Sequence, residues 1–170
     1  EEVQISSSTG RVRDDGSAEF IDFIGNAAAG SNRGLELESQ WLATENISVY
    51  GSLGLLDSRY LKFINSTGEN LDGREQAHAP AYQFTLGAGI IFNPALSMDI
   101  NIQGRDSFYF SDSHAIQSDS YTLLNASLRY AKENISMTLW GRNLTDEDYF
   151  VRGFYFGNDP RDDYTPRSFT

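Results

Sequence analysis

The chain has 170 residues, of which 39% are hydrophobic and 22% charged, and its formal net charge at pH 7 is −11. This acidity argues against a nucleic-acid-binding protein, which needs a basic surface, and the absence of cysteine excludes disulfide scaffolds and thiolate metal sites. The 13% of aromatic residues and the fifteen glycines favour strands and turns over helices. No apolar stretch approaches the roughly 20 residues that a membrane-spanning helix needs.

Apolar and polar side chains alternate in segment after segment, as expected for β-strands with two unlike faces. One face of the segment 96–108 carries Leu96, Met98, Ile100 and Ile102, and the other carries polar residues such as Asp99. The predicted strand Phe20–Thr44 is long, and we expect it to be bulged or broken around Ala27–Asn32, where Gly30 relaxes the backbone. The seven predicted strands are Val3–Ser8, Phe20–Thr44, Ile47–Asp57, Ala81–Phe92, Leu96–Phe108, Ser120–Ala131 and Ile135–Asn143.

Short and long connections alternate strictly along the chain. Tight turns of two or three residues join every second pair of strands, and links of more than ten residues join the others. This order is typical of the up-and-down meander of a transmembrane barrel, with short periplasmic turns and long extracellular loops. The turns are Glu45–Asn46, Asn93–Ala95 and Lys132–Asn134, and the links are Ser58–Pro80, Tyr109–Asp119 and Leu144–Arg167.

A β-sandwich would show the same alternation of side chains, but its connections need not alternate in length. Aromatic residues near the strand ends fit the two interfacial girdles of a barrel. They fit the core of a sandwich equally well, so both interpretations stay open. These residues are Trp41, Phe92 and Tyr130 by the short turns, and Phe108, Tyr109, Phe110 and Tyr121 by a long link.

Three motifs resemble the C-terminal barrel of TonB-dependent receptors. The segment Asn32–Glu38 is similar to their GxExE strand, and His78–Tyr82 resembles the proline that opens a descending strand. Trp140–Tyr149 resembles their penultimate strand, with Asn-Leu-x-Asp followed closely by tyrosine. The motifs occur in the family's order, and the resemblance covers nearly the whole chain.

The resemblance implies an all-β fold in which residues 1–170 form an antiparallel meander, the C-terminal part of a large transmembrane barrel of about 22 strands. It also implies active uptake across the outer membrane of a Gram-negative bacterium, of a ferric siderophore, haem, cobalamin or an oligosaccharide. TonB would be engaged through an N-terminal plug, and outer-membrane lipid would contact the barrel. We expect the plug, its TonB box and the closing strand to be absent from this chain, and we expect no cofactor.

Residues suited to catalysis or metal binding are scattered. His78 and His114 lie far apart in predicted links, whereas a metal site needs clustered ligands. The cluster Asp159–Asp163 lacks the spacing of a calcium loop. Neither a nucleophile elbow nor a pair of facing carboxylates is recognisable. We therefore expect no metal and no enzymatic activity.

The segment Asp146–Tyr164 combines aromatic rings with arginines and aspartates. On an extracellular loop these groups could stack on and pair with an anionic chelate or a sugar, or they could anchor the loop on the rim. With Ser58–Pro80 and Tyr109–Asp119, this segment would form a substrate vestibule. The candidate substrate-binding residues are Arg152, Tyr155, Asp159 and Arg161.

Two other classes of function remain open. A soluble antiparallel β-domain that binds a ligand or partner protein would be monodisperse without detergent, whereas an isolated barrel segment would expose its apolar face and open edges and aggregate. An extracellular carbohydrate-acting enzyme would need a cleft with opposed carboxylates.

Overall fold

A computed structural model describes residues 3–12, 18–27, 29–65, 68–112 and 115–153. All helices and strands assigned within these ranges are β-strands. These described residues include no helix that is long and apolar enough to cross a membrane. The strands are β1 (Val3–Val12), β2 (Ala18–Ala27), β3 (Ala29–Thr44), β4 (Ile47–Lys62), β5 (Tyr82–Asn93), β6 (Leu96–Arg105), β7 (Tyr121–Lys132) and β8 (Ile135–Gly141).

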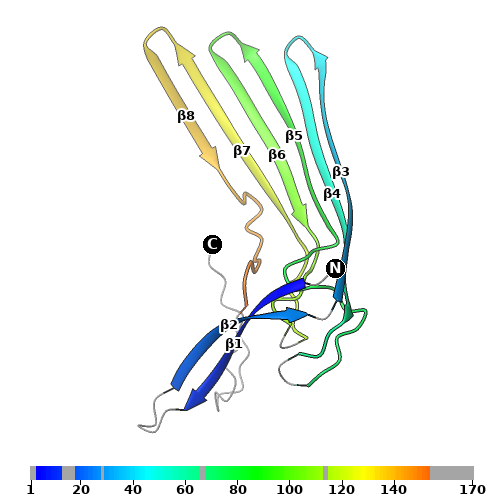
Figure 1. The fold of residues 1–170 in the computed structure, drawn as a ribbon. Coiled ribbons are helices and arrows are strands. Elements are labelled where there is room, and N and C mark those ends of the chain that lie inside the picture. Colours follow the sequence, from blue (N-terminus) through cyan, green and yellow to red (C-terminus); the bar gives the residue numbers. More distant parts are fainter. Residues whose placement is uncertain (1–2, 13–17, 28, 66–67, 113–114, 154–170) are drawn as a thin grey trace.

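Strands β3 to β8 form one antiparallel sheet in which each strand pairs with its neighbours in sequence, and β1 and β2 form a separate two-stranded sheet. Figure 1 shows the three tight turns of the larger sheet gathered at one end and the long connections at the other. The predicted alternation of short and long links therefore sorts the connections to opposite ends of the sheet. The predicted break in the segment 20–44 is confirmed, because β2 ends at Ala27 and β3 begins at Ala29.

The strand boundaries differ from the prediction at several places. Strand β1 continues to Val12, four residues past the predicted end at Ser8, and β8 ends at Gly141, two residues before the predicted Asn143. Strand β4 continues to Lys62, so the expected start of the long link at Ser58 is wrong. The cause is a backbone segment that folds back along the strand, where the N–H of Tyr60 donates to the carbonyl oxygen of Arg74 at 2.9 Å. Strand β6 ends at Arg105, three residues before Phe108, because Phe108 turns into a cluster formed by the loops.

One face of the larger sheet is apolar and exposed. Its aliphatic side chains follow the period-two pattern across all six strands, and the register places Leu86 beside both Gly51 and Ile102. Side chains this exposed have no other described residue packed over them, so this face needs an apolar environment. Exposed fractions run from 37% to 74% for Leu35, Leu37, Leu53, Leu55, Leu86, Leu128, Ile135, Met137 and Leu139.

The aromatic residues at the two ends of the sheet behave differently. By the short turns, Trp41, Phe92 and Tyr130 are 65%, 54% and 36% exposed, as an interfacial girdle requires. At the opposite end Phe108 and Phe110 are only 1% and 3% exposed. The girdle interpretation is therefore wrong for these two phenylalanines, which form a local core among the loops.

The other face of the sheet is polar and carries a hydrogen-bonded ladder. The Tyr50 hydroxyl on β4 reaches across β5 and lies 3.1 and 3.0 Å from the two carboxylate oxygens of Asp99 on β6. The ring passes directly over Gly87, where a Cβ atom would lie 2.3 Å from it. Glycine is therefore required at this position for the close approach.

Amides extend the ladder from β6 to the segment beyond β8. Asn101 donates to Asp99 at 3.2 Å, and Asn125 on β7 donates to Asn101 at 3.0 Å. The backbone N–H of Asn143 then donates to the side-chain oxygen of Asn125 at 3.1 Å. The ladder thus fixes the lateral register of these strands through their polar side chains.

Replacing Tyr50 with phenylalanine tests the contribution of this ladder. Tyr50→Phe keeps the ring over Gly87 but removes the donor to Asp99, and we expect a loss of about 1–3 kcal/mol in the free energy of unfolding. Tyr82→Phe is the matched control, since that exposed ring lies on the apolar face. Guanidinium unfolding of the full-length protein measures both variants, and equal stabilities would contradict the role given to the ladder.

Candidate functional site

Three long connections gather at the end of the sheet opposite the tight turns (Figure 1). The first loop comprises residues 63–81, the second loop residues 106–120, and the third loop residues 142–153, the part of the last connection that the structure describes. The contacts among these three loops determine which side chains surround the polar face of the sheet at this end.

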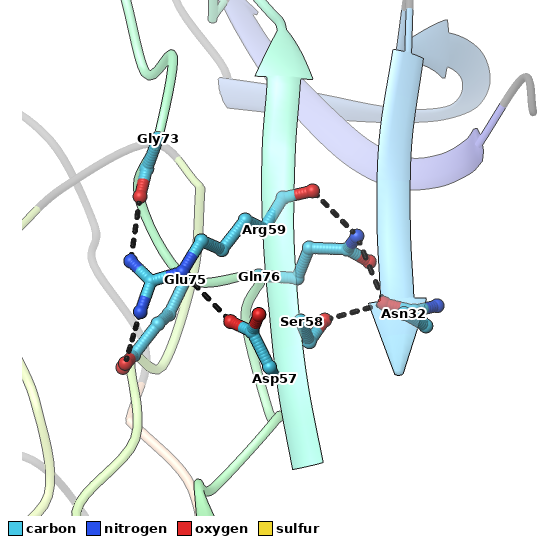
Figure 2. Close-up of polar contacts among 7 residues, drawn as sticks. All are labelled: Asn32, Asp57, Ser58, Arg59, Gly73, Glu75 and Gln76. Carbon is cyan, nitrogen blue, oxygen red and sulfur yellow. Dashed lines mark hydrogen bonds and ion pairs between the residues drawn. The ribbon is translucent and has the colours of Figure 1, made fainter. Parts of the chain in front are cut away.

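Arg59 holds the first loop against β4 (Figure 2). Its Nε atom pairs with Asp57 at 2.7 Å, and its Nη1 atom donates to the carbonyl oxygen of Gly73 at 3.0 Å. A longer contact of 3.9 Å joins Nη2 to Glu75. Because these side chains are about one-third to one-half exposed, each ion pair adds little stability, and the arginine serves chiefly to orient the loop.

A second set of polar contacts anchors the first loop to β3. The Ser58 hydroxyl donates to the side-chain oxygen of Asn32 at 2.7 Å, and the Gln76 amide donates to the same oxygen at 3.2 Å (Figure 2). Ser58 is 3% exposed. The first loop is therefore tied to two neighbouring strands.

Apolar packing completes this anchor. Tyr60, Phe63 and Leu71 form a small core in which the side chains are 2%, 8% and 3% exposed, and the two rings lie 4.7 Å apart. Asp72 caps the turn by accepting the N–H of Phe63 at 2.9 Å. Burial of these side chains makes the first loop a folded element of the structure.

The first and second loops are joined through Arg74. Its guanidinium lies 4.0 Å from the centre of the Tyr109 ring and donates to the carbonyl oxygen of Ser111. Nearby, the Asn65 amide donates to the carbonyl oxygen of Asp112 at 3.0 Å. Charge-assisted hydrogen bonds are stronger than neutral ones, and a cation–π contact adds to them. The first and second loops therefore form one packed unit.

Phe108 lies at the centre of the second loop. The His78 ring packs 5.6 Å from it, the Arg105 guanidinium lies 4.3 Å from its centre, and Phe110 meets it edge-on at 5.6 Å. The third loop joins this cluster at Gly153, where a Cβ atom would come within 2.6 Å of the Phe110 ring. All three loops therefore meet around one aromatic core.

A groove of about 570 Å³ opens on the polar face of the sheet beside this core. Side chains from β3 to β7 and from the third loop line it, and the rings of Tyr121 and Tyr149 meet 4.5 Å apart in its wall. The groove combines aromatic surface with charged and amide groups, as in many small-molecule sites. Its polar and aromatic lining includes Glu36, Glu38, Gln83, Gln103, Arg105, Tyr121 and Tyr149.

The candidate residues from the sequence are only partly placed by the structure. Arg152 is exposed on the third loop, next to Val151 in the groove wall. Tyr155, Asp159 and Arg161 lie outside the described residues. Within the described ranges, no group of three or more histidine, cysteine or acidic side chains could hold a metal ion.

Sequence reasoning did not select Arg105 and Tyr121 as site residues. Both lie on the polar face, at the loop ends of β6 and β7, and the register pairs them directly. The alternation within the segment 96–108 puts Arg105 on the same face as Asp99, but only the folded loops bring the third loop over it. The sequence alone does not indicate which residues of different strands and loops lie close together.

The pKa of His78 is lowered from the usual value of 6.5, first by partial burial and then by the positive charges of Arg105 and Arg152. A hydrogen bond to the Phe110 backbone opposes this effect. Below pH 6.5 the folded state therefore binds fewer protons than the unfolded state. The stability that neutral His78 provides is present above pH 6.5 and is lost as the pH falls through the folded-state pKa.

We expect the loop cluster to loosen on acidification from pH 7.5 to pH 5, seen as faster hydrogen exchange in residues 106–112. His78→Asn is the matched variant, because asparagine tolerates the φ of 58° at this position and does not titrate. The acid-induced increase should be smaller in this variant. An identical pH response in both proteins would contradict the role of His78.

Residues 3–144 match a family model described as TonB dependent receptor-like, beta-barrel. The chain belongs to this family. The sequence-based resemblance to TonB-dependent receptors is thereby confirmed, and so is the all-β antiparallel meander as part of their barrel.

The crystal structure of the siderophore receptor PiuA from Acinetobacter baumannii is similar to this TonB-dependent receptor-like barrel segment. The two share 21% sequence identity with a TM-score of 0.62, and the match covers 88% of this chain. It covers 22% of the PiuA chain, so the present chain spans about a fifth of that receptor's length. At this identity the likeness concerns the fold.

The barrel architecture of this family indicates which environment each face of the sheet contacts. In a transmembrane barrel the exposed aliphatic face turns outward and the polar face lines the lumen, because hydrocarbon cannot solvate polar groups. In such barrels the short turns lie at the periplasmic end and the long loops at the extracellular end. The groove beside Phe108 lies at the loop end of the polar face.

Proposed function

We propose that residues 1–170 are the C-terminal part of a TonB-dependent receptor that imports a scarce nutrient across the outer membrane of a Gram-negative bacterium. The observation that carries this proposal is the family match together with a lumen-facing groove beside three packed loops. The substrate is a small molecule such as a ferric siderophore or an oligosaccharide. The similar protein PiuA is itself named a siderophore receptor.

In this proposal the segment provides wall, lining and loops, and performs no catalytic step. The outward aliphatic face contacts outer-membrane lipid and holds the barrel in the bilayer. TonB supplies energy through the plug of the full-length receptor and does not contact this segment. Arg152, with Tyr155, Asp159 and Arg161, is proposed to contact substrate from the third connection.

The folded state of the loops supports a binding role. A preformed mouth loses less conformational entropy when it closes on a substrate than disordered loops would. Here the first and second loops are already joined through Arg74, and the third packs against Phe110. Substrate can therefore bind a largely organised surface.

Transport assays test the proposal. A strain that lacks the gene is complemented with the full-length receptor and offered labelled ferric chelates, haem, cobalamin and oligosaccharides. We expect uptake of one of these classes, dependent on both the receptor and TonB, and recovery of the receptor in the outer-membrane fraction. Recovery as a soluble protein, or equal uptake with and without TonB, would contradict the proposal.

A further inference from the structure

Three basic residues lie at the loop end of the groove, although the chain is strongly acidic, with a net charge of −11. Arg105 and His78 pack on the same Phe108 ring, at 4.3 and 5.6 Å. Arg152 follows Val151 in the groove wall and precedes Gly153, which packs on Phe110. The three groups come from β6, the first loop and the third loop.

Among the described residues, no carboxylate forms an ion pair with Arg105. The ion pairs within the described ranges belong to Arg59, and the Nε atom of Arg105 is buried there without a hydrogen-bond partner. Leaving a buried charged donor unpaired is costly. An oxyanion that binds the terminal nitrogens of the same guanidinium would offset part of that cost. Stacking on Phe108 holds that guanidinium in place at the groove.

The carboxylates of the same groove lie on its far side. Glu36 shares a register row with Gly54, Gln83 and Arg105, three strand spacings from the arginine. That separation is about 14 Å, which exceeds the Debye length at physiological ionic strength. The two carboxylates that line the groove therefore do not neutralise Arg105.

We propose that Arg105, Arg152 and His78 form an anion-binding site that takes an oxyanion group of the substrate. The inference rests on the proposed function, because it names the substrate class of that receptor as anionic. Guanidinium groups suit oxyanions through paired, charge-assisted hydrogen bonds. The Tyr121–Tyr149 pair in the same groove offers a flat surface for an aromatic part of such a ligand.

Binding of two chelates that differ in charge tests the site. The full-length receptor in detergent is dialysed to equilibrium against a trianionic hexadentate ferric tris-catecholate and an uncharged hexadentate ferric tris-hydroxamate. We expect the anionic complex to bind at least about tenfold more tightly. Arg105→Gln and Arg152→Gln should each weaken its binding about tenfold or more, as expected for a lost charge-assisted hydrogen bond.

Arg129→Gln is the matched control, since Arg129 is an exposed residue of the same polar face, near the tight turns. It should leave the affinity for both complexes unchanged. Heat-modifiable electrophoretic mobility verifies that each variant is folded. Equal affinity of the wild type for the two complexes, absence of binding, or equal losses in all three variants would overturn the site.

The test separates this inference from the proposed function. TonB-dependent uptake of an uncharged nutrient, with no preference for the anionic complex, would leave the receptor function standing and remove the anion site. Tight, arginine-dependent binding of the anionic complex without TonB-dependent uptake would support the site and contradict the transport function.

Discussion

Leu86→Arg is expected to destabilise the folded barrel by about 2–4 kcal/mol, the cost of a charged side chain on the lipid face near the bilayer midplane. Leu86 is 51% exposed and lies in the outward row between Gly51 and Ile102. Its neighbour Thr85 lies on the opposite face, in a row with Ser52 and Gln103. Thr85→Arg places the same charge on the polar, lumen-facing side of the strand and should cost about 0.5 kcal/mol or less.

Guanidinium unfolding of the full-length receptor reconstituted in lipid bilayers measures both variants. The comparison is sharp because the two positions are adjacent in sequence and carry the same new residue. Similar losses for Leu86→Arg and Thr85→Arg would mean that both faces meet the same environment. That result would contradict the assignment of an outward and a lumenal face.

Phe108→Ala is expected to cost about 3–5 kcal/mol in the local stability of the loop cluster. The side chain is 1% exposed and contacts the rings of His78 and Phe110 and the guanidinium of Arg105. Its removal leaves a cavity that three separate loops would have to close. The N–H of Ser118, which donates to the Phe108 carbonyl at 2.9 Å, should lose protection from hydrogen exchange.

Phe92→Ala provides the control for Phe108→Ala. Phe92 is 54% exposed beside a tight turn, so its removal leaves no cavity among the loops. Exchange in residues 106–120 should then match that of the wild type, whereas in Phe108→Ala it should rise while the β6–β7 pairing stays protected. Unchanged exchange in Phe108→Ala would show that the loops do not depend on this aromatic core.

The sheet could be predicted from sequence because its determinants are local. In the segment 96–105 the alternation of apolar and polar residues indicates which face of the sheet each side chain occupies. A shift of the strand register by one residue would exchange the two faces. Tight turns then fix which strands pair. For this reason the predicted strands agree with β4 to β8 at their turn ends to within one or two residues.

The loops and the candidate site depend on contacts that sequence spacing does not encode. Arg74 meets Tyr109, and Asn65 meets Asp112, across more than thirty residues of chain. The continuation of β4 past Asp57 depends on pairing with residues 73–76 in the same way. Arg105 lies beside His78 on a shared ring only because the loops fold together, which the sequence does not indicate.

The central claim is that β6 presents one side to hydrocarbon and the other to an aqueous lumen. A nitroxide scan from Leu96 to Arg105 in the reconstituted full-length receptor tests it most directly, and this chain contributes no cysteine of its own to interfere. Oxygen should relax the labels at positions 98, 100 and 102, and a water-soluble nickel complex those at 99, 101 and 103. Preferential access of the nickel complex to positions 98, 100 and 102, or loss of the period of two, would contradict the account.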